Sequence, residues 1–350
     1  MSWFGCLVMG VNLRDLLSFR QIDLKELSGR VIAIDAMNAL YQFLAIIRQP
    51  DGTSLMDSRG NITSHLSGIF YRTINLLEVG IKPVYVFDGE PPELKLETVE
   101  ERVKVRREAA KRWEEALEKG DLEEARKFAQ ASSKLTDEMV EESKRLLEAM
   151  GVPYVQAPSE GEAQASYMAR RGDAWGVASQ DYDSLLYDSP RLVRNLTISG
   201  RRKLPKRDIY VRVEPELVLL DENLESLGIT REQLIGIGIL LGTDYNEGVK
   251  GIGVKTALKL VKEKGSIERV VEEEKLEIFP PVEEIKKLFL KPQLTDNYKI
   301  RWEPIDKNQV YSILCDEHDF SRERVQKALE RIREEEKVKA QSRLEQFFKP

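Results

Sequence analysis

The sequence predicts an α/β fold with a twisted, mostly parallel sheet and helices on both of its faces. Two continuous apolar runs, Val31–Ile34 and Pro83–Phe87, have the length and composition of buried parallel strands. Each run is followed directly by an aspartate, Asp35 in the first case and Asp88 in the second. Helix-like patterns separate the two runs. Strands that alternate with helices and end in acids are typical of open α/β sheets, which place their sites at the carboxyl ends of the strands.

The composition indicates a globular chain with ample material for a buried core. It has 350 residues, of which 41% are hydrophobic and 33% are charged, and its formal net charge is −6. This length suits one large domain or a domain with an appendage. Because the chain is mildly acidic rather than basic, any contact with nucleic acid would come from local patches.

Cysteine and histidine are rare, with two residues of each. This is too few for a zinc site built from Cys and His, and Cys6 and Cys315 do not suggest a disulfide framework. We therefore expect an intracellular protein. No apolar run approaches the length of about 18 residues that is typical of a membrane helix. The apolar start lacks the basic residues of a signal peptide, so we expect no membrane association.

The segment from Leu94 to Ala149 contains no proline and is dominated by charged residues. Gly120-Asp121 interrupts its helical pattern, with Asp121 as a candidate N-cap. Residues 94–112 have so few apolar side chains that core packing cannot be their main support, and we expect them to be mobile or to await a partner. Further strands are expected at residues 152–155, 175–178, 191–197 and 209–213, and helices at residues 37–48, 63–78, 230–241, 310–315 and 322–333.

Two pairs of acids share one spacing, Glu160/Glu162 and Asp181/Asp183, and they bracket a helix-like segment and a short strand. Carboxylates this close repel one another unless cations neutralise them, and burial makes unpaired charges costly. The resulting hypothesis is a metal site made only of oxygen ligands. Such ligands suit Mg²⁺ or Mn²⁺ rather than zinc.

Each acid also has a simpler interpretation. Ser159-x-x-Glu162 matches a capping box, in which acids are favoured near the start of a helix. Asp181-Tyr182-Asp183 would direct both acids to one side if extended, but it is equally a solvated turn. Asp244 follows an apolar helix and could cap the next one, and the acids after the two apolar runs could be caps as well. Their joint occurrence at the ends of apolar elements favours a shared site.

Seven segments carry a more specific signal. They read MGVNLRDL, VIAIDAMNALYQFL, SHLSGIFYRTINLLEVGIKPVYVFDGEPPELK, YVQAPSEGEAQA, ASQDYDSLL, LLGTDYNEGVKGIGVKTAL and QSRLEQFF. Together they resemble the flap endonucleases, the structure-specific 5′ nucleases of the XPG-type superfamily with a PIN-like fold, from about Met9 onward. The resemblance implies cleavage of branched DNA at the base of a 5′ flap, with 5′–3′ exonuclease activity, in DNA replication (Okazaki fragment maturation) and in DNA repair.

The resemblance also implies a two-metal centre. The acids that match the metal-site positions of the family are Asp35, Asp88, Glu160, Glu162, Asp181, Asp183 and Asp244. They would hold two Mg²⁺ ions, with Mn²⁺ as a substitute, and how they divide between the two ions stays open. Two such ions about 4 Å apart activate water and stabilise the attacking and the leaving oxygen of a phosphodiester.

Two positive side chains, Lys95 and Arg102, lie seven residues apart, which puts them on one face of a helix after two turns. An ordinary solvated helix face explains this spacing equally well. The resemblance implies that both contact the scissile phosphate and that residues 94–134 form a helical arch for the 5′ flap. It further implies that Tyr41 stacks on a base beside the cut, a use that needs no sequence readout, although core packing is the simpler alternative. By the same resemblance, Arg48 contacts phosphates of the template strand.

The segment GVKGIGVKTALKL has glycines that allow a close approach of the backbone to a phosphate, followed by a helix start with free N–H groups. Such contacts hold a duplex without reading its sequence, although a glycine-rich turn between helices is the alternative. The segment resembles a helix-hairpin-helix-type motif at residues 242–265, and the resemblance implies a K⁺ ion there. The expected DNA-contacting residues are Gly248, Gly251, Gly253, Lys255 and Thr256.

The terminal segment has a compact pattern of Gln341, Leu344, Phe347 and Phe348. One helical turn puts its apolar side chains on one side, and exposed terminal aromatics suggest a pocket on a partner. The pattern resembles a peptide that binds the sliding clamp PCNA, and a tail folded back on its own domain is the alternative. The absence of a basic nuclear-targeting extension favours an archaeal enzyme, located in the cytoplasm near the nucleoid. A eukaryotic relative would be nuclear.

The expected organisation is a monomer built around one nuclease domain. Two alternatives are a sister nuclease that prefers nicks, ends or bubbles, and an inactive DNA-clamp adaptor. The modest length of the predicted arch and the complete set of acids argue against a bubble-cutting nuclease and an adaptor, respectively. The expected parts are residues 1–8 as an addition before the true start, 9–106 as the N-terminal nuclease region, 94–134 as the arch, 135–265 as the internal nuclease region with the DNA-binding motif at 242–265, 266–334 as a C-terminal helical part, and 335–350 as a tail with the clamp motif at 341–348.

Overall fold

The computed structural model describes residues 10–49, 51–119, 121–198, 200–203 and 210–332, and its centre is a seven-stranded mixed sheet. The strands have the order β1-β9-β6-β5-β2-β3-β4, and all neighbours are parallel except the pairs formed by β9. The predicted α/β class with a mostly parallel sheet is confirmed. The strands are β1 Arg20–Gln21, β2 Val31–Asp35, β3 Lys82–Phe87, β4 Tyr154–Gln156, β5 Gly176–Ala178, β6 Arg191–Arg194 and β9 Glu216–Leu219, and a separate hairpin is formed by β7 Gly200–Lys203 and β8 Tyr210–Val213.

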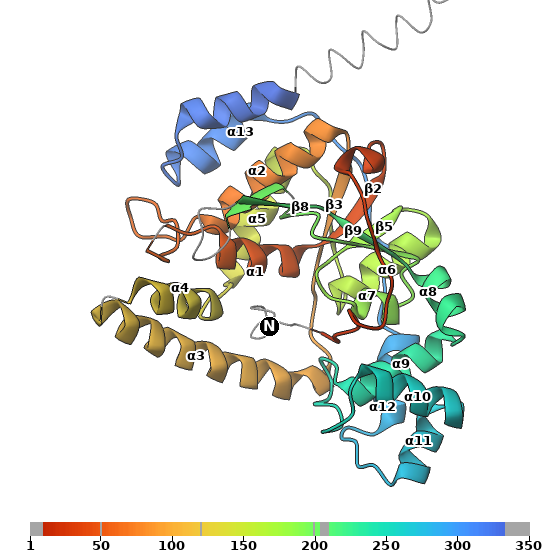
Figure 1. Cartoon of the computed structure of the whole chain (residues 1–350). Helices are drawn as coiled ribbons and strands as arrows, with labels where there is room; N and C mark the ends of the chain where they lie inside the picture. Colours follow the sequence, from red (N-terminus) through yellow and green to blue (C-terminus); the bar gives the residue numbers. More distant parts are fainter. Residues whose placement is uncertain (1–9, 50, 120, 199, 204–209, 333–350) are drawn as a thin grey trace, which may run out of the picture.

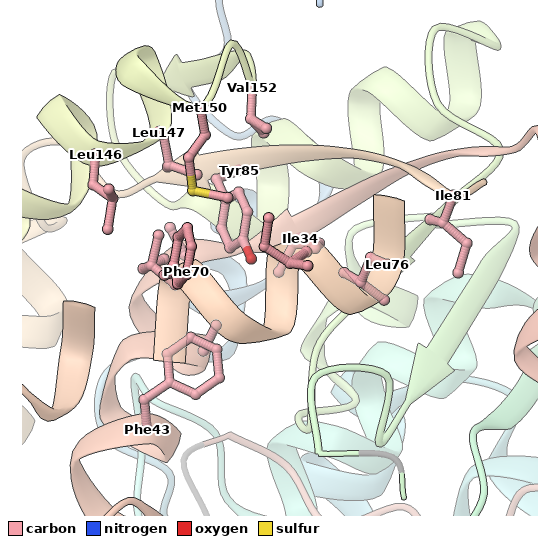
Figure 2. Packing of buried hydrophobic residues seen from close by; sticks show 14 of the residues in the cluster. Ile34, Phe43, Phe70, Leu76, Ile81, Tyr85, Leu146, Leu147, Met150 and Val152 are labelled. Carbon is pink, nitrogen blue, oxygen red and sulfur yellow. The ribbon is translucent and has the colours of Figure 1, made fainter. Parts of the chain in front are cut away.

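Alternate residues of the two central strands support helices on both faces of the sheet (Figure 1). Ile34 and Tyr85 belong to a core shared with α1, α2 and α5, in which Phe43 and Phe70 are also buried (Figure 2). Val84, on the opposite face, joins a smaller core with α6. Because side chains of a strand alternate in direction, the continuous apolar runs are explained by burial on both sides.

The helices are regular and mostly match the predicted segments. They are α1 Ala36–Ile46, α2 Ser64–Val79, α3 Leu96–Glu118, α4 Leu122–Ala131, α5 Asp137–Ala149, α6 Gly161–Arg171, α7 Asp183–Leu186, α8 Leu220–Leu227, α9 Arg231–Leu241, α10 Val254–Lys264, α11 Ile267–Glu274, α12 Val282–Leu290 and α13 Lys307–Tyr311, with a last helix over residues 322–332. The helix predicted at residues 310–315 is wrong in its bounds, because α13 ends at Tyr311 and a π-helical turn, Ser312–Asp316, follows it. No helix in the described ranges is both long enough and apolar enough to cross a membrane.

Helices α3 and α4 pack against each other, and α4 contacts α1 (Figure 1). Asp121 caps α4 as predicted, since its Oδ1 accepts a hydrogen bond from the N–H of Glu124 at 3.0 Å. The side chains that the structure buries in this pair are small: Ala109, Ala116 and Ala129. Among the other described side chains of the pair, Trp113 and Phe128 are half-buried, whereas Leu96, Val103 and Val105 are exposed. The apolar surface that these side chains bury is small, which agrees with the charged composition of the segment.

A third apolar cluster lies under α7 and α9–α12. Its members include Leu186 of α7, Ile237 of α9, Val261 of α10 and Phe289 of α12. This cluster joins the sheet to helices α9–α12, which Figure 1 shows at one end of the molecule. The candidate site lies at the carboxyl ends of β2 and β3, beside α6, α7 and α9, which these cores hold in place.

Candidate metal centre

The structure gathers the sequence-predicted acids at the carboxyl ends of the parallel strands. Asp35 ends β2, and Asp88 directly follows β3. The remaining acids come from the first turn of α6, the loop after β5, the start of α7 and the turn after α9: Glu160, Glu162, Asp181, Asp183 and Asp244. Several contacts join these acids: Lys95 pairs with both Glu160 and Asp244, Asn38 bonds both Asp35 and Asp181, and Gly161, between Glu160 and Glu162, donates to Asp88.

Asn38, in the first turn of α1, joins two of these acids. Its N–H donates to Asp35 Oδ1 at 3.0 Å, so that Asp35 caps α1, and its Nδ2 donates to Asp181 Oδ2 at 2.8 Å. The hydroxyl of Ser179 donates to Asp35 Oδ2 at 3.4 Å. The capping interpretation of Asp35 is therefore correct, and it coexists with a place in the acid cluster.

The capping box predicted from Ser159 and Glu162 is wrong. Helix α6 begins at Gly161 with Glu160 as its N-cap, and the hydroxyl of Ser159 donates instead to the carbonyl of Glu90 at 2.9 Å. The first N–H of the helix, that of Gly161, donates to Asp88 Oδ1 at 2.7 Å. A Cβ at residue 161 would lie 2.6 Å from that oxygen, so glycine permits this approach.

The extended arrangement considered for Asp181-Tyr182-Asp183 is also wrong. Tyr182 has helical dihedral angles (φ −91°, ψ −1°), and Asp183 is the first residue of α7. Its Oδ1 accepts a hydrogen bond from the N–H of Val11 at 2.8 Å, while the N–H of Gly10 donates to Asp244 Oδ1 at 3.0 Å. The start of the described chain thus contributes two backbone donors to the acid cluster.

Lys95 lies inside the cluster, although it precedes α3 in a short 3₁₀ turn, Glu93–Lys95. Its Nζ is 2.6 Å from Glu160 Oε2 and 3.3 Å from Asp244 Oδ2, and 13% of the side chain is exposed. Burial opposes the charge of Lys95, but the carboxylates of Glu160, Asp244 and Asp88 outweigh it and raise its pKa. Lys95 therefore remains a cation at any physiological pH.

The acids themselves are buried to the point of resisting ionisation. Burial raises the pKa of Asp35 and Asp88 to about 6 and the pKa of Glu160 and Asp183 to about 7. Burial likewise raises the pKa of Glu162, to which the charges of Asp35, Asp181 and Asp183 add. One ammonium group is too little positive charge for this many carboxylates.

A divalent cation fits this site by its donor chemistry. The donors are carboxylate oxygens, which Mg²⁺ and Mn²⁺ prefer. Glu162 Oε1 is buried with no hydrogen-bond partner among the described residues, and a buried carboxylate oxygen needs such a partner. Across those same residues, no three His, Cys, Asp or Glu side chains converge closely enough to form a finished ligand set. The acids contact Lys95 and backbone N–H groups instead, so ligation would require some of them to exchange these partners for the cation.

The raised pKa values predict how metal-free protein responds to pH. Because the folded acids hold protons to a higher pH than unfolded ones, their stabilising contribution is complete below about pH 4 and is lost as the pH rises through 6 to 7. We expect the Tm in EDTA to fall by several degrees between pH 5 and pH 8, and Mg²⁺ to restore it at pH 8 but hardly at pH 5. Scanning calorimetry measures both, and Asp183→Asn should flatten the pH dependence. A Tm that rises over this pH range in EDTA would contradict the assignment.

Tyr41 and Arg106 face each other between α1 and α3. The guanidinium of Arg106 lies 4.6 Å from the centroid of the Tyr41 ring, and its NH1 donates to the Tyr41 hydroxyl at 3.2 Å. Tyr41 is half-buried here rather than a core residue. Arg102 lies in α3, and its side chain falls outside the described part. Arg48 is half-buried and donates to Gly52 O at 2.9 Å and Ser133 Oγ at 2.7 Å.

The loop that we predict to bind DNA is exposed at two of its glycines and at the start of the helix that follows. Gly251 and Gly253 are exposed, and an added Cβ at either position would meet no atom within 4 Å. Gly253 is the N-cap of α10, and Lys255 and Thr256 lie exposed in its first turn. The first N–H groups of α10 have no partner within the helix, as at any helix start. Gly248 packs instead against Gly242, and its φ of +78° favours glycine.

Some of the sequence-based predictions concern residues outside the described ranges. They are the eight residues before Met9, Met9 itself, and the terminal motif of Gln341, Leu344, Phe347 and Phe348. Within the described ranges, sequence reasoning missed Asn38, Arg106 and the N–H group of Val11, whereas the family resemblance implied that Gly10 lies near the site, as its contact with Asp244 confirms. The three-residue spacing from Asp35 to Asn38 is a capping signal that could have indicated Asn38. No local signal exists for the others, because their partners are distant in the chain.

Comparisons with known proteins identify the class. The XPG N-terminal domain matches residues 9–109, and the XPG I-region matches residues 151–244. Flap endonuclease 1 of Hyperthermus butylicus is 60% identical over 331 residues, which cover 93% of this chain and 94% of the relative. Flap endonuclease 1 of Pyrococcus furiosus is 54% identical and covers 97% of this chain and 100% of that relative. The solved flap endonuclease-1 from Methanococcus jannaschii superposes with a TM-score of 0.74 at 46% identity, covering 94% of this chain and 100% of that structure.

An α/β sheet with acids at its strand ends and both XPG regions defines a nuclease, a hydrolase of phosphodiester bonds. The chain belongs to the flap endonuclease 1 family. Full-length identity above half extends to several archaeal relatives, so the membership rests on the whole chain rather than on one motif.

Proposed function

We propose that the chain cuts DNA at the base of a 5′ flap by hydrolysis that depends on two Mg²⁺ ions, with 5′–3′ exonuclease activity, in DNA replication and repair. The observation that carries this proposal is the buried group of carboxylates around Lys95 at the strand ends. An all-carboxylate site with excess negative charge suits divalent cations and is otherwise costly to bury. Mn²⁺ would substitute for Mg²⁺ because it accepts the same ligands.

The ions would be held by Asp35, Asp88, Glu160, Glu162, Asp181, Asp183 and Asp244, directly or through water. When bound, they would activate water and neutralise charge on the phosphodiester. Lys95 already carries a positive charge beside Glu160, and we propose that it stabilises the scissile phosphate together with Arg102. Tyr41 would exchange its contact with Arg106 for a base beside the cut.

We propose that the helices between residues 94 and 134 form an arch for the 5′ flap. Their poor apolar packing and high charge support a segment that is completed by nucleic acid. The exposed loop around Gly251 and Gly253, with Lys255 and Thr256 beyond it, would hold the duplex through its phosphates, with a K⁺ ion as a further ligand. Arg48 would contact the template strand.

We propose that the terminal segment around Phe347 and Phe348 docks on the PCNA clamp, since two adjacent aromatics in a charged tail suit a partner pocket. The protein would act as a monomer in the cytoplasm, near the nucleoid of an archaeal cell. The remaining boundaries of the predicted parts stay as proposed, with the nuclease domain running from residue 9 to about residue 334.

A cleavage assay on three labelled substrates tests the proposal. A double-flap substrate, a nicked duplex and a bubble of the same sequence are incubated with Mg²⁺ or with EDTA. We expect the flap to be cut fastest, at its base, and no cutting in EDTA. Preference for the nick or the bubble would identify a sister nuclease, and binding without cutting would identify an adaptor. Cutting at full rate in EDTA would overturn the metal-dependent mechanism.

A further inference from the structure

A single arginine of β6, Arg194, holds the loop that carries two of the acids. Its Nε donates to the carbonyl of Gln180 at 3.1 Å, and its NH1 donates to the hydroxyl of Tyr182 at 2.6 Å. The guanidinium also lies 4.4 Å from the centroid of the Tyr182 ring. Gln180 and Tyr182 are the two neighbours of Asp181, and Tyr182 directly precedes Asp183. Arg194 therefore contacts the residues on both sides of Asp181 and the residue directly before Asp183.

The orientation of Arg194 is itself fixed by a buried carboxylate. Its NH1 is 3.2 Å from Glu216 Oε2 on β9, the neighbouring strand, and 13% of the Arg194 side chain and 9% of the Glu216 side chain are exposed. Arg14 binds the same carboxylate with both terminal nitrogens, each at 3.0 Å. Two guanidinium groups, those of Arg14 and Arg194, thus share the Glu216 carboxylate behind the acid-bearing loop. The bidentate pairing of Arg14 fixes the Glu216 carboxylate, and Glu216 in turn holds Arg194 through one hydrogen bond from its NH1.

A second arginine of the same strand provides the comparison. Arg191, at the other end of β6, donates to the carbonyl of Trp175 at 3.1 Å and stacks 5.1 Å from the Trp175 ring centroid. It makes the same kinds of contact as Arg194, a backbone carbonyl and an aromatic face. Trp175 precedes β5, however, whereas Gln180 and Tyr182 follow it on the side of the acids. Loss of Arg191 should thus cost packing without moving Asp181 or Asp183.

We propose that Arg194 is a positioning residue for the metal centre, which sets Asp181 and Asp183 in place through the loop from Gln180 to Tyr182. The inference rests on the proposed metal-dependent function and adds a residue to it. Arg194 acts through the loop, since its hydrogen bonds go to Gln180, Tyr182 and Glu216. Groups that orient metal ligands from behind typically change metal affinity or activity by about 10- to 100-fold when they are removed.

The test compares Arg194→Met with Arg191→Met in the full-length protein. Binding of Mn²⁺ is measured by isothermal titration calorimetry without DNA, and the Mg²⁺ concentration for half-maximal flap cleavage is measured separately. For Arg194→Met we expect the Kd for Mn²⁺ and the half-maximal Mg²⁺ concentration each to rise by about tenfold or more. The cleavage rate at saturating metal should be largely restored. Arg191→Met should leave both values within about twofold of the unmodified protein, because it does not hold the acid-bearing loop. Arg14 still neutralises Glu216 in Arg194→Met, so the loss is not that of an unpaired buried charge.

Two further variants keep the outcome decisive if Arg194→Met folds poorly. Tyr182→Phe removes the hydroxyl that Arg194 bonds and keeps the ring, so we expect a smaller, few-fold weakening of Mn²⁺ binding. Arg194→Lys keeps the charge but cannot span three acceptors, so it should fall between the unmodified protein and Arg194→Met. Unchanged Mn²⁺ affinity in Arg194→Met and Tyr182→Phe, or an equal loss in Arg191→Met, would overturn the proposal while leaving the nuclease function intact. Absence of Mn²⁺ binding to the unmodified protein would overturn the metal centre as well.

Discussion

Replacing Asp181 by alanine is expected to abolish flap cleavage while DNA binding stays nearly unchanged. Asp181 lies in the loop after β5, where its Oδ2 accepts a hydrogen bond from Asn38 at 2.8 Å. Removing one carboxylate from a metal centre costs several kcal/mol of charge stabilisation in the transition state. A loss of about 4 kcal/mol corresponds to a rate lower by about 10³-fold. Single-turnover cleavage of a labelled double flap measures the rate, and fluorescence anisotropy measures the Kd for DNA.

An exposed acid provides the control for this variant. Asp221 lies in the first turn of α8, far from the strand ends that carry the cluster, and its replacement by alanine should leave the cleavage rate unchanged. Flap cleavage by Asp181→Ala at the rate of the unmodified protein would contradict the assignment of the site. A large loss of DNA binding in that variant would instead mean that Asp181 supports the fold of the DNA-contacting surface.

Replacing Lys95 by methionine is expected to slow cleavage and to shift its pH dependence upward. The ammonium group lies 2.6 Å from Glu160, and its charge lowers the pKa of Asp35, Asp88, Glu160 and Asp183 against the effect of burial. Without it, these acids bind protons more tightly, so that protons compete with Mg²⁺ to a higher pH. We expect the rate at saturating Mg²⁺ to fall by about 10²- to 10³-fold, as for loss of a preorganised charge at a transition state. Under limiting Mg²⁺, the pH of half-maximal rate should rise.

Lys286 offers a matched control in α12. Its side chain is also 13% exposed, and it also pairs with two carboxylates, those of Glu268 and Glu232. Lys286→Met should lower the stability of the fold modestly and leave both the rate and the pH profile in place. The interpretation of Lys95 fails if Lys95→Met keeps its rate, or if Lys286→Met shifts the pH profile equally.

Several parts of the fold follow directly from the sequence. The continuous apolar runs predicted β2 and β3, and their burial on both faces of the sheet explains why no polar residue interrupts them. Parallel strands bring their carboxyl ends to one edge, so the positions of Asp35 and Asp88 at the ends of two such runs predict that they meet. The family resemblance then predicted the remaining acids of the site, because its motifs run along the whole chain.

Predictions from local sequence patterns were wrong where a residue bonds to a partner that is distant in the sequence. Ser159 and Glu162 have the spacing of a capping box, but Ser159 bonds to Glu90 and the helix start bonds to Asp88. An extended segment was one interpretation of the residues around Asp183, yet Asp183 starts a helix. Spacing rules describe the energy of a short segment alone. A buried carboxylate that needs a donor can outweigh that local preference.

The fold class, the family and the acids that could form the site are all readable from the amino-acid sequence. The folded arrangement was needed to show that Lys95 lies between Glu160 and Asp244, and that Arg194 holds the loop around Asp181. It was also needed to show that the N–H of Gly10 reaches an acid 234 residues away. The physical reason is that these contacts depend on how the sheet and its helices bring distant segments together. The spacing of residues along the chain does not indicate which distant segments meet. Apolar periodicity and acids at the ends of apolar runs, in contrast, are visible directly in the amino-acid sequence.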